Sequence, residues 1–184
     1  MKVLGICGSP RKGANTEFAL NFTLNELKEL GFETERISLA EKEVKFCNHC
    51  GKCLEGKECP IKDDAKEVFD KMIAADAIII ASPVYYVSVS AQVKALFDRS
   101  IMIRGKLKGK LGGAIAVGQA RNGGQEIVCD QIHQWMLTHE MRLVAMRFGG
   151  TLVGSMKDLE AVKRDEFGLN SCKNLAKKIA EALR

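Results

Sequence analysis

The stretch KVLGICGSPRKGANT, residues 2–16, joins a short apolar run to a polar loop that contains glycine and serine. The run Lys2–Cys7 predicts a buried strand, and the apolar spacing of Leu20, Leu24 and Leu27 after the loop predicts a helix. In such a strand–loop–helix unit, the first free backbone N–H groups and the positive end of the helix dipole converge on the loop. This arrangement favours the binding of a phosphate group.

Two familiar phosphate motifs do not fit this loop. Gly8 and Gly13 have the spacing of a Walker A motif, but Ala14 and Asn15 occupy the positions of its lysine and its metal-binding hydroxyl. The pattern GxGxxG is also absent from the sequence of this loop, which argues against a dinucleotide pyrophosphate. The loop suits a single phosphate without a metal, and an ordinary helix-capping turn is the alternative. The candidate donors and charges are Ser9, Asn15, Thr16, Arg11 and Lys12.

Strand-like and helical patterns alternate along the rest of the chain. A uniformly apolar run, AIIIA at residues 77–81, has the composition of a central parallel strand covered on both faces. Further strands are predicted over residues 33–39, 111–117 and 143–153, with helices between them. This alternation predicts one domain of 184 residues, an α/β fold with a doubly wound parallel sheet that binds its ligand at the carboxyl ends of the strands.

Two further segments at predicted strand ends have ligand-binding character. Residues 82–88, SPVYYVS, contain both tyrosines of the chain beside a proline, and this pair could flank a planar ring or pack in the core. Residues 118–125, GQARNGGQ, are polar and glycine-rich, so their backbone amides could bond the edge of the same planar ligand. The helix between the two segments ends in Asp98-Arg99, which is expected to form a surface or interface ion pair.

Four of the seven cysteines form the pattern C-x2-C-x2-C-x5-C within residues 47–59. Gly51 and Gly56 can turn such a loop so that its thiols face one compact centre, most simply a [4Fe-4S] cubane. A structural zinc site, for which His49 is an extra candidate ligand, and redox-active or incidental thiols are the alternatives. The ferredoxin run C-x2-C-x2-C-x3-C-P is close to this pattern, since Pro60 follows the last cysteine. Lysines that could favour the reduced state of a cluster surround the pattern at Lys45, Lys52, Lys57 and Lys62.

The other histidines and cysteines are scattered along the chain. His133 and His139 are expected to be helix-face or core residues, because no second ligand lies at suitable spacing. Cys7, Cys129 and Cys172 are expected to be small buried hydrophobes.

Charge and hydropathy exclude some classes of partner. The formal net charge is +5, but basic and acidic residues are interleaved, so no binding of nucleic acid is expected. A mild positive field favours an acidic protein donor or an anionic cofactor. The sequence has no run of eighteen apolar residues and its first residues lack the features of a signal peptide, so we expect no membrane association and a cytoplasmic, reducing location.

The motifs GSPRKGANT and SPVYYVSVSAQVKALFDR, together with the compact cysteine pattern, give the chain a family resemblance. It resembles the iron–sulfur flavoproteins of anaerobic archaea and bacteria, within the flavodoxin-like FMN-reductase group. The first two motifs alone point to the broader group, and the cysteine pattern selects the branch that carries a cluster. The resemblance implies a flavodoxin-like five-stranded sheet of order 2-1-3-4-5, with a cluster-binding loop, residues 45–61, inserted after the second strand.

The resemblance also implies FMN, one [4Fe-4S] cluster per subunit, and subunits that form homodimers, often paired into tetramers. The cluster ligands would be Cys47, Cys50, Cys53 and Cys59. The FMN phosphate would lie at Ser9, Arg11, Lys12, Gly13, Asn15 and Thr16. The isoalloxazine ring would lie near Pro83, Val84, Tyr85, Tyr86 and Val87, and near Ala120, Arg121, Asn122, Gly123 and Gly124.

Two redox centres in one small domain predict an electron-transfer oxidoreductase. A cubane passes one electron at a time and a flavin holds one or two, so we expect single electrons from a ferredoxin-like donor to reach a small acceptor such as oxygen, peroxide or a quinone. No residue is assigned a catalytic role. The alternatives are an NAD(P)H-dependent FMN or quinone reductase with a structural zinc site, and a redox sensor that acts on a partner through loss of its cluster.

Overall fold

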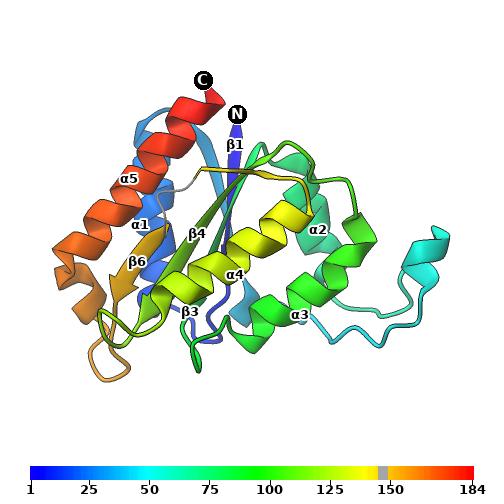
Figure 1. Ribbon diagram of the computed structural model, residues 1–184, viewed down its shortest axis with the longest axis horizontal. Helices are drawn as coiled ribbons and strands as arrows, with labels where there is room; N and C mark the ends of the chain where they lie inside the picture. Colours follow the sequence, from blue (N-terminus) through cyan, green and yellow to red (C-terminus); the bar gives the residue numbers. More distant parts are fainter. Residues whose placement is uncertain (145–148) are drawn as a thin grey trace.

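A parallel sheet lies between two layers of helices in the computed structural model, which describes residues 1–144 and 149–184 (Figure 1). The strand order is β2-β1-β3-β4-β5, and β6 also pairs with β4, so the predicted order 2-1-3-4-5 is confirmed. All the strand pairings are parallel. The strands are β1 (Lys2–Cys7), β2 (Glu33–Ser38), β3 (Ala77–Pro83), β4 (Leu111–Gly118), β5 (Arg142–Leu143) and β6 (Gly150–Val153).

The single fifth strand predicted over residues 143–153 is instead two short strands on the same edge of β4. The register offset to β4 grows from 31 residues at the Leu111–Arg142 pair to 35 at the Ile115–Gly150 pair. Gly149 has a φ of +65°, a left-handed conformation that ends an extended segment. A Cβ atom at Gly149 would lie 2.3 Å from the carbonyl oxygen of Ala114, so the backbone passes too close to β4 for a side chain. Residues 145–148 of the predicted strand lie outside the described residues.

Side chains of the central strands alternate between the two helical layers. Ile78 and Ile80 of β3 face one core cluster, whereas Ile79 faces the other. Helices α1 (Asn15–Glu29) and α5 (Glu166–Leu183) cover one face of the sheet, and α2, α3 and α4 cover the other (Figure 1). The bounds of the latter are Ala65–Ala74, Ala91–Arg99 and Gln125–Thr138. None of the helices in the described residues has the length and apolar character that crossing a bilayer requires.

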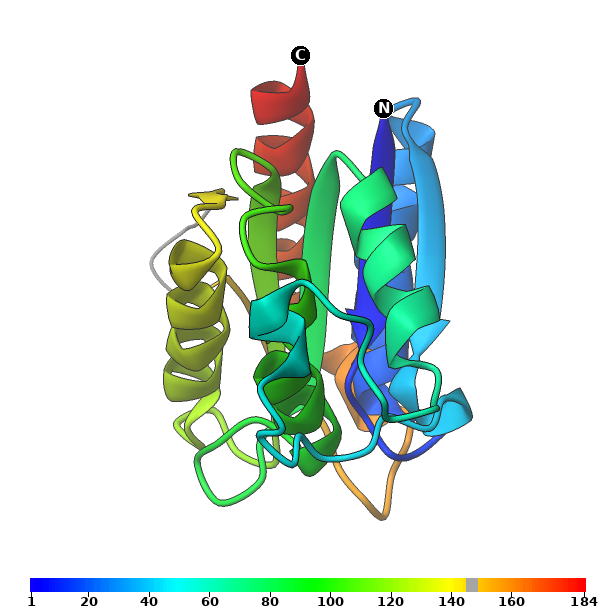
Figure 2. The same cartoon turned by 90° about the vertical axis from the view of Figure 1, so that its right-hand side faces the viewer.

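The order of the strands fixes where a ligand can lie. The chain runs from β1 outward to β2 and then back across β1 to β3, so the connections after β1 and β3 diverge at the carboxyl end of the sheet. Figure 1 shows these loops at the end of the sheet opposite the chain termini. The cysteine loop, residues 45–61, follows β2 and projects beside α2 and α3 (Figures 1 and 2).

Candidate functional site

A cavity of about 540 Å³, here called the sheet-edge cavity, lies at the carboxyl ends of β1, β3, β4 and β6. Half of the residues that the sequence predicts for FMN line it, and the loops after β1 and β3 supply them: Ser9, Arg11, Asn15, Thr16, Pro83, Val84, Tyr85 and Tyr86. The loop after β1 and the loop after β3 are thus brought together, as the rule for the carboxyl ends of parallel strands requires.

The N-terminus of α1 opens into this cavity without a side-chain cap. Ala14 occupies the N-cap position and supplies no hydrogen bond from its side chain, whereas Ser90 caps α3 and Asp165 caps α5. Within the described part of the chain, Asn15 Oδ1 is buried and has no hydrogen-bond partner. Free N–H groups at a helix start attract an anion, because the helix dipole places partial positive charge there. The observed geometry therefore suits a phosphate group.

The loop after β1 is held in place by close packing around Gly8. Its N–H donates to the carbonyl oxygen of Ala81 at 2.7 Å, and its carbonyl accepts from Ser90 Oγ at 2.6 Å. A Cβ atom at Gly8 would lie 2.1 Å from Val93 Cγ2, so the position has no room for a side chain. Ser9 Oγ then accepts from the N–H of Arg11 at 3.1 Å, which turns the chain toward α1.

The tyrosine segment forms a strained tight turn. The backbone groups of Tyr85 and Ser88 exchange two hydrogen bonds of 3.0 Å, and the two residues between them, Tyr86 and Val87, have φ values of +49° and +59°. Bulky residues rarely adopt this left-handed conformation, and such strain concentrates at ligand sites. Gln131 of α4 holds the turn, because its Oε1 accepts from Ser88 Oγ and from the N–H of Val89, each at 3.0 Å. The turn leaves the Tyr86 side chain fully exposed.

The remaining wall comes from two strand ends. Gly118 and Gln119 line it at the end of β4, and residues 154–156 line it after β6. Sequence reasoning missed residues 154–156, although the carboxyl end of the last strand must reach the same edge of a parallel sheet. Asn15 Nδ2 donates to the carbonyl oxygen of Ser155 at 2.8 Å, which joins this wall to the start of α1.

Several residues predicted for FMN lie outside the lining of the cavity. They are Lys12, Gly13, Val87, Ala120, Arg121, Asn122, Gly123 and Gly124. Lys12 is exposed and lies 3.5 Å from Glu41. Two backbone groups of residues 120–124 already bond the side chain of Gln125. Gln125 Nε2 donates to Ala120 O at 2.7 Å, and Gln125 Oε1 accepts from the N–H of Gly123 at 2.9 Å.

Arg121 is directed away from the cavity toward the start of α5. Its guanidinium bonds Asp165 and stacks over the ring of Phe167, at 4.9 Å from the ring centre. Burial alone would raise the pKa of Asp165, but the hydrogen bonds from Arg121 and from the N–H groups of Val153 and Gly168 hold it below its usual value. Asp165 therefore ties together the loop after β4, the end of β6 and the start of α5 as a carboxylate.

A second cavity, of about 270 Å³ and here called the cysteine cavity, lies within the cysteine loop. The four predicted ligands, Cys47, Cys50, Cys53 and Cys59, all line it. Gly51 and Gly56 have φ values of +74° and +73° and bracket the 3₁₀ helix Lys52–Glu55, so their left-handed conformations turn the loop as the sequence predicts. Across the described ranges 1–144 and 149–184, no three His, Cys, Asp or Glu side chains lie close enough together to hold a single metal ion.

The prediction that Asp98-Arg99 forms a surface ion pair is wrong for Arg99. Arg99 is 1% exposed and forms a two-pronged ion pair with Asp63, at 2.6 and 3.2 Å, whereas Asp98 pairs with Lys94 on the surface. The start of α2 lies beside the end of α3, which brings Asp63 to Arg99. Burial alone would lower the pKa of Arg99, but the hydrogen bonds that it donates to Asp63 and the negative charge of Asp63 raise it.

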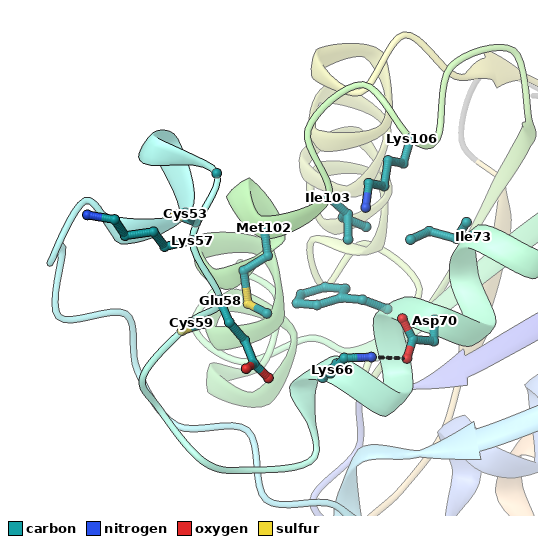
Figure 3. A pocket seen from close by; sticks show the side chains of 12 residues that line it. Cys53, Lys57, Glu58, Cys59, Lys66, Asp70, Ile73, Met102, Ile103 and Lys106 are labelled. Atoms are coloured by element: carbon teal, nitrogen blue, oxygen red, sulfur yellow. Dashed lines mark hydrogen bonds and ion pairs between the residues drawn. The ribbon is translucent and has the colours of Figure 1, made fainter.

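A third hollow, of about 410 Å³, lies behind the cysteine loop, between it and α2 (Figure 3). Cys53 and Cys59 belong to its walls as well as to the cysteine cavity. Figure 3 shows Lys66 and Lys106 at this hollow, with Lys66 paired to Asp70 at 2.7 Å. Apolar side chains and charged side chains of both signs thus line a hollow next to two of the cysteines.

The isolated cysteines and His133 and His139 are not among the residues that line the two cavities. Cys7, Cys129 and Cys172 are buried as predicted, and burial raises the pKa of Cys7 to about 11 and that of Cys172 to about 12. His139 packs against Trp135, and its Nε2 lies 2.8 Å from Ser100 Oγ. Burial lowers the pKa of His139, so it is a neutral core residue.

Comparison with known proteins shows the family and the fold of the chain. Residues 1–149 match the family model described as NADPH-dependent FMN reductase. An iron–sulfur flavoprotein of Methanocaldococcus jannaschii is 48% identical, over 100% of this chain and 98% of that protein. An iron–sulfur flavoprotein of Methanosarcina thermophila is 43% identical, over 100% of this chain and 95% of that protein. A solved flavodoxin from the domain Archaea has the same fold, with a TM-score of 0.67 at 17% identity over 100% of this chain and 99% of that one.

Proposed function

The chain belongs to the NADPH-dependent FMN reductase family and to its iron–sulfur flavoproteins, and from this membership we propose an oxidoreductase that holds FMN in the sheet-edge cavity and a [4Fe-4S] cluster in the cysteine cavity. It takes single electrons from a ferredoxin-like donor and reduces a small acceptor such as oxygen, peroxide or a quinone. The observation that carries the proposal is the presence of two separate cavities in one domain, one at an open helix start and one lined by four cysteines.

The sheet-edge cavity supplies what FMN needs. The free N–H groups at the start of α1 bind the phosphate, with Arg11 as a nearby charge and Thr16 as a hydroxyl donor. The apolar edge formed by Val84, Tyr85 and Tyr86 flanks the ring and excludes water from it. The missing side-chain cap and the unpartnered Asn15 Oδ1 support this assignment, because both leave polar groups that a ligand would satisfy.

The cysteine cavity fits a cluster better than a zinc ion. Tetrahedral zinc draws four ligand atoms to about 2.3 Å from one point. The described residues contain no such tight group, yet four cysteines surround one cavity of about 270 Å³. A larger inorganic group held at its corners by Cys47, Cys50, Cys53 and Cys59 suits four cysteines that line one cavity. When bound, the cluster exchanges one electron at a time and FMN one or two, which matches a one-electron donor to a two-electron acceptor.

Charge supports an acidic protein as the electron donor. The chain carries a formal net charge of +5, and the hollow that shares Cys53 and Cys59 with the cysteine cavity is lined by three lysines and two carboxylates. A net positive charge attracts an acidic partner and speeds its association. We also propose that the protein forms homodimers or tetramers, since Phe46 and Leu54 of the cysteine loop are 79% and 63% exposed.

The cofactors can be tested on protein purified without air. We expect flavin bands with a broad shoulder, and iron and acid-labile sulfide in equal amounts near four per chain. Replacing Cys50 with Ala should remove the shoulder and the iron while flavin binding stays within a factor of two, because Cys50 lies outside the sheet-edge cavity. Colourless protein that carries zinc alone would overturn the proposal.

The donor can be tested by rapid mixing. We expect reduced ferredoxin to reduce the flavin at least ten times faster than NADPH does, and we expect added salt to slow that reaction because opposite charges bring the partners together. The family description favours a second candidate, an NAD(P)H-dependent reductase. Fast flavin reduction by NADPH without ferredoxin would establish that second candidate instead.

A further inference from the structure

The neck of the cysteine loop contains a buried side chain that bonds both of its ends, beside the hydrogen bonds between Glu43 and Asp64. Arg99 Nη1 donates to the carbonyl oxygen of Lys45 at 3.1 Å, where the loop begins, and to Asp63 Oδ2 at 2.6 Å, just after the loop ends. Arg99 Nη2 donates to Asp63 Oδ1 at 3.2 Å, and the N–H of Lys45 donates to Asp63 Oδ2 at 2.8 Å. The two ends of the loop are therefore joined to each other and to α3 by this group.

The same guanidinium also reaches one of the four cysteines. Arg99 Nη2 lies 3.5 Å from Cys59 Sγ and 3.8 Å from Met102 Sδ. Within the described residues, the other hydrogen bond to a cysteine sulfur of this loop comes from the loop itself, from the N–H of His49 to Cys47 Sγ at 3.4 Å. Within the described residues, Arg99 is thus a side chain from outside the loop that hydrogen-bonds a predicted ligand.

Burying the Arg99–Asp63 ion pair costs more free energy than placing such a pair on the surface would. The side chains of Arg99 and Asp63 are 2% and 1% exposed, and taking both charges out of water is costly unless nearly every donor and acceptor is satisfied. Asp63 meets this demand with hydrogen bonds from Arg99, Lys45 and Ala65. Arg99 does not, because its Nε is buried without a partner in the described part of the chain. An apolar side chain could pack at the end of α3, so packing alone does not account for an arginine there.

We propose that Arg99 is a positioning residue for the iron–sulfur cluster: it holds the neck of the cysteine loop closed and places the Cys59 sulfur at the wall of the cysteine cavity. This inference rests on the proposed function for the identity of the cluster. A hydrogen bond from a cation stabilises negative charge on a ligand sulfur. The loop is thereby set for iron before the cluster forms, and Arg99 favours the more negative, reduced state once it has formed.

The decisive variant is Arg99→Lys, with Lys94→Gln as its control. A lysine keeps the positive charge but loses the planar fork, so one ammonium cannot serve Asp63, Lys45 and Cys59 together. Lys94 is on the same helix, is exposed and pairs with Asp98 at 2.6 Å, so its replacement removes a nearby charge without touching the neck. If Arg99→Lys fails to fold, the double variant Arg99→Met with Asp63→Asn removes both buried charges while keeping similar shapes.

The first measurement is hydrogen exchange on the full-length protein without metal. We expect the backbone of residues 45–61 to exchange at least ten times faster in Arg99→Lys than in the wild type and in Lys94→Gln. We expect residues 8–16 to exchange at unchanged rates. Faster exchange throughout the chain would mean that the pair merely stabilises the fold and would overturn the proposal, as would exchange of residues 45–61 at the wild-type rate.

The second measurement is made on protein reconstituted with iron and sulfide. We expect Arg99→Lys to need several times more iron than the wild type for half-maximal loading. We expect the reduction potential of the double variant to shift to more negative values. In both variants, FMN affinity should stay within a factor of two of the wild type. Normal loading together with an unchanged potential would overturn the proposal. Wild-type protein that takes up no iron would overturn the proposed function and the cluster part of this inference, whereas the exchange experiment judges closure of the neck independently.

Discussion

The sheet-edge cavity takes its walls from four loops that are far apart in the sequence, whereas the cysteine cavity is formed by one loop and the end of α3. The sheet-edge cavity is supported by strands whose central side chains are fully buried, and its position follows from the strand order. The second rests on a projecting loop whose neck contains a buried ion pair. The first cavity should therefore fail when packing is disturbed, and the second when its local backbone or its neck is disturbed.

The largest effect is expected from Gly8→Ala in the sheet-edge cavity. The new Cβ would lie 2.1 Å from Val93 Cγ2 and 3.1 Å from Ala81 O, and a β-branched side chain on a buried helix has little freedom to move. We expect the free energy of unfolding to fall by about 1–3 kcal/mol. We also expect FMN affinity to fall more than about tenfold, or about 1.4 kcal/mol, because the phosphate loop is displaced.

Urea unfolding and flavin titration measure both quantities for Gly8→Ala. Gly13→Ala is the matched control, because Gly13 has a φ of +63° but no atom within 4 Å of the new Cβ. It should show backbone strain with a smaller loss of FMN. Equal losses of FMN in the two variants would mean that packing at Gly8 does not position the phosphate loop.

The next effect is expected from Asn15→Ala, which separates the two polar walls of the sheet-edge cavity. This change removes the hydrogen bond to Ser155 O and the buried Oδ1 that would face the ligand. We expect FMN affinity to fall about tenfold, which corresponds to about 1.4 kcal/mol. Lys12→Gln is the control and should change the affinity less than twofold, since Lys12 lies outside the cavity beside Glu41. A larger effect from Lys12 than from Asn15 would reverse the assignment of the phosphate site.

The comparison of the two cavities also explains what could be predicted from the sequence. The strand Lys2–Cys7 and the helix after it were predictable because apolar spacing depends on local sequence, and the strand order followed from the family resemblance. Residues 120–124 were favoured for their glycines, but the side chain of Gln125 uses their backbone instead. Residues 154–156 follow β6, which ends at Val153 as predicted, but their own sequence carried no sign that they line a cavity.

The role of Arg99 could not be predicted from sequence. An Asp-Arg pair at the end of an amphipathic helix has the pattern of a solvent-exposed pair. Its true partner, Asp63, lies 36 positions earlier in the chain. Only the packing of α2 beside α3 brings the two together and buries them. The cysteine pattern, by contrast, was evident because all four residues belong to one loop.

A smaller effect is expected from Gly56→Ala in the cysteine loop. Gly56 has a φ of +73° and no atom within 4 Å of an added Cβ, so backbone strain of about 1–2 kcal/mol is the whole cost. Because the strain is confined to this loop, iron should be lost faster to a chelator while FMN affinity stays the same. Gly105→Ala is the matched control, since Gly105 has a φ of +77° and equally open surroundings outside the cysteine loop. Equal loss of iron in both variants would contradict local control of the cysteine cavity.

The smallest effect is a pH dependence of stability that comes from Asp165. This residue bonds the end of β6, next to the wall of the sheet-edge cavity at residues 154–156. Asp165 accepts hydrogen bonds from Arg121, from the N–H of Val153 at 2.7 Å and from the N–H of Gly168 at 3.1 Å. Its pKa in the folded protein is lowered by these contacts in spite of burial, so it lies below the value of about 3.9 expected in an unfolded chain. A lowered pKa contributes stability that is present above about pH 3.9 and is lost as the pH falls through the folded value.

The variant Asp165→Asn isolates this contribution. At pH 7 we expect it to lower the free energy of unfolding of the cofactor-free protein by no more than about 1 kcal/mol, because Asn also caps helices and Arg121 is 43% exposed. The gap between wild type and variant should stay constant from pH 7 to about 5 and close at lower pH, where the wild type loses the same charge. A gap that widens in acid would mean that another group controls this wall. If the difference in stability between wild type and variant closes in acid, a charged group supports one wall of the sheet-edge cavity, although packing sets its position. In that respect the wall resembles the neck of the cysteine loop.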